Sequence, residues 1–144
     1  LQQLRDALRW MEGRDFKFFV SVQYSWLVEA SAEIGDVETA RRYAAHVLNR
    51  ARDGERLGEA AASRALAMLA ARANDSIDFH RWMKRANLSA RVRGSRREAA
   101  LNEALSAQIR RAQGDQAAAA QAERAAADLA AMGVKLWPGV RPGH

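Results

Sequence analysis

A nine-residue segment recurs in this chain at a fixed distance, and this repeat limits the folds open to it. The segment 58–66, GEAAASRAL, returns 39 residues later at 97–105 as REAALNEAL, with five of nine positions identical. A further step of 39 residues back from Leu66 falls on Leu27. A constant period between about 20 and 50 residues is the signature of a repeat architecture. Leu66 and Leu105 are therefore expected to hold equivalent, buried positions.

Helix-breaking residues divide the chain at nearly even intervals. They stand 19 to 22 residues apart, at Gly13, Gly35, Gly54, Asn74, Gly94, Gly114 and Gly133. Gly and Asn accept the left-handed conformation that ends a helix. Asp36, Asp75 and Asp115 follow three of these breakers and suit the N-cap of the next helix. Ser95, with Glu98 three residues later, has the form of a capping box.

The even spacing of these helix breakers predicts an all-α fold of about seven helices, with two helices in each unit of 39 to 40 residues. We expect an α-solenoid of antiparallel helix pairs, because each unit of such an array packs on its neighbours. The expected single domain covers 1–137, with a half unit at 1–13, helix pairs at 14–54, 55–94 and 95–133, and a flexible tail at 138–144. No sustained alternation of β-branched residues predicts a strand.

The helix expected at 14–34 is the richest in apolar side chains, and they fall on more than one of its faces. A helix of this kind is covered on two sides, so we expect it to be central. The alternative is an aromatic ligand pocket around Phe19 and Trp26. In the helices expected at 36–53 and 75–93, Val37 and Ile77 are assigned to the inward faces.

Residues 26–40 resemble the junction between the two helices of a tetratricopeptide repeat. Leu27, the Gly35-Asp36 pair and Ala40 match that motif, whereas the second unit departs from it at Phe79. The longer period resembles the C-terminal repeat arrays of large bacterial nucleotide-binding regulators, either cyclase-associated or maltose-regulator-type transcription activators. The resemblance covers residues 14 to 134.

The resemblance implies a scaffold for protein binding or effector sensing, within a larger bacterial signalling or transcription regulator. In such arrays the first helices of the pairs line a concave surface that takes peptides, proteins or small effectors. By position, that surface would include Ser25, Glu29, Arg64, Met68, Glu103 and Arg110. Arg64 and Arg110 are expected to be exposed there. The chain does not begin with Met, so we expect it to start inside a longer protein.

A basic patch supports an alternative hypothesis, nucleic-acid binding. It comprises Arg81, Lys84, Arg85, Arg91, Arg93, Arg96 and Arg97, in a chain of net charge +6. Such a patch can contact phosphates or an acidic partner, and it can also be a solvated face. Aromatic residues between the basic ones are few and no recognition-helix motif is visible, so this hypothesis ranks second.

Nothing in the sequence indicates an enzyme, and we predict no catalytic, cofactor or metal site. Cys is absent, and His46, His80 and His144 form no recognised metal-binding pattern. No run of 18 apolar residues predicts a membrane span. We expect a cytoplasmic protein with a protein, peptide or small-effector partner, and self-association is left open.

Overall fold

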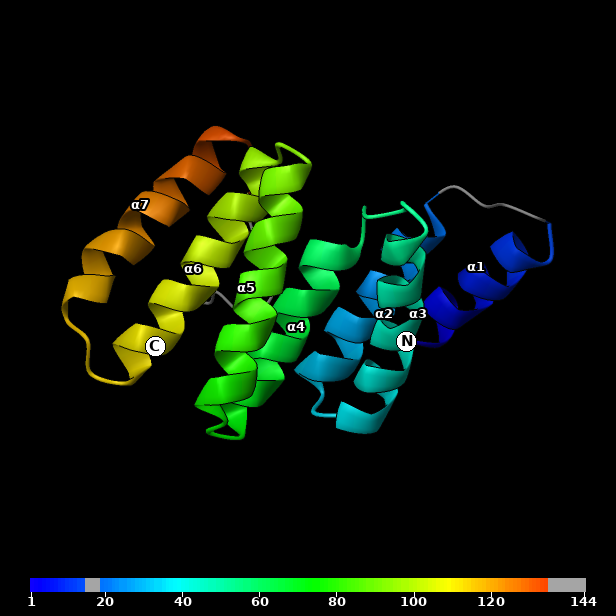
Figure 1. Ribbon diagram of the computed structural model, residues 1–144, viewed down its shortest axis with the longest axis horizontal. Helices are drawn as coiled ribbons and strands as arrows, with labels where there is room; N and C mark the ends of the chain where they lie inside the picture. Colours follow the sequence, from blue (N-terminus) through cyan, green and yellow to red (C-terminus); the bar gives the residue numbers. More distant parts are fainter. Residues whose placement is uncertain (15–18, 135–144) are drawn as a thin grey trace. The chain divides into compact units, whose positions relative to one another are not determined.

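The computed structural model describes residues 1–14 and 19–134, and all regular structure in these ranges is α-helical (Figure 1). The helices are α1 (Gln2–Glu12), α2 (Val20–Glu33), α3 (Val37–Arg52), α4 (Glu59–Arg72), α5 (Ser76–Val92), α6 (Arg96–Ala112) and α7 (Ala117–Ala131). The seven predicted helices are confirmed for these residues. The tail predicted at 138–144, which includes His144, lies outside them.

The turns that follow α2 to α7 share the geometry that the sequence predicts. The left-handed residues are Gly35, Gly54, Asn74, Gly94, Gly114 and Gly133, with φ between 56° and 98°. In each turn the next residue donates its N–H to the carbonyl five positions back, as Asp36 does to Ser31 at 2.9 Å. This bond satisfies a carbonyl that the end of the helix would leave free. Gly13 is the exception, because its φ of −67° is right-handed, so the prediction for this residue was wrong.

The predicted N-caps are confirmed for three of the four helices. Asp36 and Asp75 each accept the backbone N–H of the residue three positions on through Oδ1, at 3.0 Å. Asp115 lies one residue before the N-cap of α7, which is Gln116, although its Oδ1 accepts the N–H of Ala117 at 3.0 Å. Ser95 Oγ accepts the N–H of Glu98 at 3.3 Å. These bonds satisfy donors that have no partner inside a helix.

The chain divides into two compact units, unit 1 at Leu1–Ser89 and unit 2 from Ala90 onward. In unit 1, α2 packs against α1, α3 and α4, and α3 also packs on α4. In unit 2, α6 packs against α7. Helices that are neighbours in sequence are mostly neighbours in space within each unit, in an antiparallel arrangement (Figure 1).

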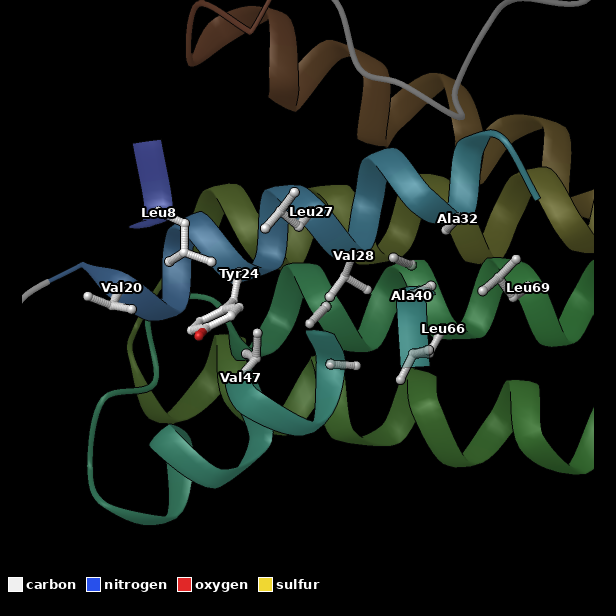
Figure 2. Packing of buried hydrophobic residues seen from close by; sticks show 13 residues of the cluster. Leu8, Val20, Tyr24, Leu27, Val28, Ala32, Ala40, Val47, Leu66 and Leu69 are labelled. Atoms are coloured by element: carbon white, nitrogen blue, oxygen red, sulfur yellow. The ribbon is translucent and has the colours of Figure 1, made fainter. Parts of the chain in front are cut away.

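The core of unit 1 joins four helices, as Figure 2 shows. Leu8 of α1, Leu27 of α2, Val47 of α3 and Leu66 of α4 are buried in one cluster. Leu27 and Leu66 stand one period apart and both belong to this cluster. Burial of Leu66 is therefore confirmed.

The core of unit 2 is smaller and rich in alanine. Leu101 and Ala104 of α6 pack with Ala125 and Leu129 of α7. Leu105 is also buried, with 3% of its surface exposed, as the repeat predicts.

Several expectations about burial were wrong. The second helix begins at Val20 rather than at 14, directly after Phe19, which has a φ of 66°. Phe19 and Trp26 are 60% and 45% exposed, so α2 is covered less completely than predicted. Val37 and Ile77 are also exposed rather than inward. Each of these two lies in the first turn of its helix, at the edge of the unit.

None of the helices in the described ranges combines the length and the apolar character that crossing a membrane requires.

Candidate binding groove

A groove with a volume of about 470 Å³ lies on unit 1, where α3, α4 and α5 meet. Its deepest part is apolar, because Leu66 and Leu69 of α4 come from the core of the unit. Small side chains widen it, at Ala44, Ala45, Ala70 and Ala73. Its volume lies within the range of natural ligand pockets, which are mostly apolar with a few polar groups.

The α5 side of the groove carries charges that satisfy one another. Arg81 Nη2 donates to Asp78 Oδ2 at 3.2 Å, and its guanidinium lies 4.9 Å from the centre of the Trp82 ring. A cation at this distance over an indole is attracted by the π electrons. Asp75 is engaged as the N-cap of α5.

The α3 side of the groove carries one charged residue, Arg41. Arg41 is exposed, and within the described part of the chain its side chain takes part in no ion pair or hydrogen bond. Its neighbours on the same wall, Val37, Ala45 and Leu48, are apolar. The groove therefore has one guanidinium available to a ligand.

Apolar side chains are exposed in two places that are close in sequence to lining residues of the groove. Arg72 donates to the carbonyl of Ala32 at 2.6 Å and to Glu33 at 3.1 Å, which places the ends of α2 and α4 together. Ile34, in the turn after α2, is 66% exposed, and Ile77, in the first turn of α5, is 79% exposed. The apolar surface available to a partner thus extends beyond the groove.

The residues predicted for a concave surface in unit 1 do not form an exposed site. Arg64 is 2% exposed, and its Nη2 lies 3.6 Å from Glu29 Oε1. Ser25 is buried and donates to the carbonyl of Val22, while Met68 packs on the core. The predicted exposure of Arg64 was wrong because α2 and α4 pack directly together, which makes this face an interior one.

The two predicted residues of unit 2 are linked to each other through α7. Arg110 donates to Asp115 Oδ2 and to Gln121 Oε1, both at 2.9 Å. Gln121 Nε2 donates to Glu103 Oε1 at 3.3 Å. The bond from Arg110 is the main cause of the lowered pKa of Asp115. Arg110 is exposed, as predicted, but its guanidinium is already engaged within the unit.

The basic patch is partly neutralised. Arg81, Lys84 and Arg85 belong to unit 1, and Arg91, Arg93, Arg96 and Arg97 belong to unit 2. Arg85 pairs with the buried Glu59 at 2.9 Å, and Arg97 pairs with Glu98 at 2.9 Å. Lys84, Arg91 and Arg96 are exposed and form no ion pair among the described residues.

His46 and His80, the two histidines in the described ranges, make local contacts. His46 stacks on Tyr24 with ring centres 4.7 Å apart, and His80 Nδ1 lies 2.6 Å from the carbonyl oxygen of Ser76. Asp78, which the sequence places near His80, pairs with Arg81 instead. In residues 1–14 and 19–134, no group of three His, Cys, Asp or Glu side chains is arranged to hold a metal ion.

Sequence reasoning missed the groove and its Arg41. A usable signal exists in α3, where Arg41, Ala45 and Leu48 follow one another at helical spacing and so share one face. The contribution of Trp82 has no such signal, because it depends on how α5 lies against the other two helices.

Comparison of the chain with protein-family models, with curated proteins and with solved structures gives no match. The function of the groove therefore has to be inferred from its own residues.

Proposed function

We propose that this chain is a protein-interaction module, and that it binds a segment of a partner protein in the groove between α3, α4 and α5. The observation that carries this proposal is an apolar groove open to solvent, with Arg41 available at its wall. Grooves of this composition are the usual places for ligands to bind. Exposed Ile34 and Ile77, close in sequence to the lining residues Val37 and Asp78, favour a ligand larger than a small molecule.

The repeat supports the same class of function. Leu27, Leu66 and Leu105 are buried at equal spacing in α2, α4 and α6, and left-handed turns separate the helices. We infer a tetratricopeptide-like array, whose usual role is to present surfaces to other proteins. The proposed setting is a larger bacterial regulator in the cytoplasm, where the module recruits or senses a partner.

Binding rather than catalysis also fits the charges around the groove. Asp78 and Arg81 are engaged with each other, and Asp75 caps a helix. None of these groups is placed as a general base next to a nucleophile.

The test is to fill the groove and measure peptide binding. Ala45→Trp puts an indole into the groove from an exposed helical position, so the fold should persist. Peptides selected from a displayed random library on the wild-type protein should lose at least about tenfold in affinity for this variant. Ala126→Trp, at an exposed position of α7, is the matched control and should bind as the wild type does. A library that yields no peptide sensitive to Ala45→Trp would contradict the proposal.

The second candidate function is nucleic-acid binding, which Lys84, Arg91 and Arg96 favour because they are exposed and form no ion pair with another described residue. This hypothesis expects the chain to bind random-sequence DNA with an affinity that falls steeply as salt rises. Lys84→Glu and Arg91→Glu should then reduce both the affinity and the salt slope, whereas Ala45→Trp should change neither.

A further inference from the structure

We propose that the segment bound in the groove is acidic and amphipathic, with a carboxylate that pairs with Arg41 and a large apolar side chain that enters the groove. This inference rests on the proposed function and adds the chemical class of the partner. Its basis is the contrast between Arg41 and the other charges that line the groove.

Arg41 is the charged side chain of the groove that no other described residue engages. It is exposed and forms no side-chain ion pair within residues 1–14 and 19–134. A guanidinium presents donors in a rigid fork that matches a carboxylate in a bidentate pair. Because the surrounding wall is apolar, water screens such a pair less than it would on an open surface.

A basic ligand would meet a less favourable site. The carboxylate of Asp78 is already paired with Arg81, whose guanidinium also lies over the Trp82 ring. Asp75 Oδ1 accepts the backbone N–H of Asp78. These bonds partly neutralise both carboxylates, whereas Arg41 has no such partner among the described residues, so local charge favours acidic segments over basic ones.

The shape of the groove favours a ligand that carries a large apolar side chain next to its acidic one. Alanines at 44, 45, 70 and 73 leave room above Leu66 and Leu69, so a bulky side chain can reach the core surface. Val37 on the α3 wall is exposed, and so is Ile77 next to the lining residue Asp78 in the sequence; both offer contact to neighbouring residues of the same segment. An amphipathic helix supplies this combination, because residues three or four apart lie on one face.

The net charge of the chain also favours an acidic partner. A net charge of +6 speeds the approach of acidic partners and opposes the approach of a second copy. A partner protein with an acidic segment is therefore favoured over self-association.

The experiment is a selection from a displayed random peptide library on the wild-type protein, with counter-selection on Ala45→Trp. We expect the groove-dependent peptides to carry Asp or Glu within one helical turn of Leu, Phe or Trp. A synthetic representative should bind at least about tenfold more weakly to Arg41→Glu and detectably more weakly to Arg41→Gln. Replacing the acidic residue of that peptide by Lys should restore part of the binding to Arg41→Glu.

Arg42→Glu is the matched control. It makes the same charge change at the next position of α3, where the arginine is exposed and stacks on Tyr43 instead of lining the groove. It should change affinity by less than about threefold. Circular dichroism of each variant should match that of the wild type, because Arg41 and Arg42 are both exposed.

The outcomes separate the two proposals. Groove-dependent peptides that lack an acidic residue, or that bind Arg41→Glu as well as the wild type, overturn the acidic partner and leave the interaction module standing. The absence of any groove-dependent peptide contradicts both. A wild-type dimer in sedimentation that Ala45→Trp abolishes shows that a second copy occupies the groove, which also overturns the inference.

Discussion

Gly58 lies where α4 begins against the backbone of α2. Its N–H donates to Ser21 Oγ at 3.2 Å, and a Cβ at this position would lie 2.1 Å from the Ser21 carbonyl oxygen. Its φ of −86° is open to any residue, so the requirement for glycine is steric rather than conformational. One missing side chain therefore sets how closely two helices of the core approach.

Gly58→Ala should destabilise the protein by about 3 kcal/mol or more, at the upper end of the range for overpacking, because backbone atoms have to move. Gly35→Ala is the comparison. Its Cβ would meet nothing within 4 Å, and only the left-handed φ of 77° opposes it, at a cost of about 1 to 2 kcal/mol. Urea unfolding of both variants measures the difference. Equal losses would mean that α2 and α4 lie further apart than described.

Arg64 is the residue for which burial changes the expected effect of a mutation. Arg64→Glu should cost about 3 to 5 kcal/mol, because it removes a buried guanidinium from its half-buried partner Glu29 and puts a second carboxylate in the buried position. Arg110→Glu, at an exposed site, should cost less than about 1 kcal/mol. Thermal and urea unfolding distinguish the two. A folded, stable Arg64→Glu variant would mean that position 64 is exposed, as the sequence analysis expected.

At the scale of elements, α2 is the helix to which the rest of unit 1 is attached. Glu55, from the loop before α4, accepts the N–H of Ser21 at 2.7 Å and so caps the start of α2. Arg72 binds the other end of α2 through the carbonyl of Ala32. Tyr24, in the second turn of α2, donates its hydroxyl to Glu12 at the end of α1 and stacks on His46 of α3. These contacts thus hold α2 near its start and at its end.

The Tyr24 contact predicts a dependence of stability on alkaline pH. Burial, followed by the bond to Glu12, raises the pKa of Tyr24 from 10.0 to about 12. Because the folded-state pKa is the higher one, the stabilising contribution is complete below the unfolded pKa of about 10 and is lost as pH rises toward 12.

Tyr24→Phe tests this, because it cannot ionise. Between about pH 9 and pH 11.5 the wild-type free energy of unfolding should fall more steeply than that of Tyr24→Phe. Denaturant unfolding at several pH values gives both curves, and Tyr43→Phe serves as the control for another tyrosine of the same cluster. Parallel curves would show that Tyr24 ionises as freely in the folded protein as in the unfolded one.

The elements were largely predictable from the sequence, and their contacts were not. Gly35 and Asp36 act through bonds within a few residues of themselves, so their spacing located the turns. Asn74 took the same left-handed role as the glycines, because Asn tolerates it. The prediction of burial failed at helix ends, as at Ile77, because the periodicity of apolar residues does not indicate where a neighbouring helix stops. The groove was not predicted for a related reason, because Arg41 and Trp82 come to line one groove only through the packing of three helices.

At the scale of the whole molecule, the cores of the two compact units differ in the size of their side chains. The core of unit 1 combines leucines, valines and Tyr24 from α1 to α4. Among the described residues, that of unit 2 is rich in alanine, and its large buried side chains are Leu101, Leu105 and Leu129. Since hydrophobic stabilisation grows with the apolar area buried, unit 1 should be the more resistant to opening.

Amide hydrogen exchange measures this difference directly. Amides in the middle of α4 should exchange more slowly than those in the middle of α7, because opening α4 exposes Leu66 and Leu69 whereas opening α7 exposes mostly alanine. Intrinsic helix propensity alone gives the opposite order, since alanine is the best helix former and α7 is rich in it. Leu66→Ala should accelerate exchange in α4 and in α2, its partner in the core. Slower exchange in α7 than in α4 would mean that local propensity, rather than burial in the core, governs the stability of these helices.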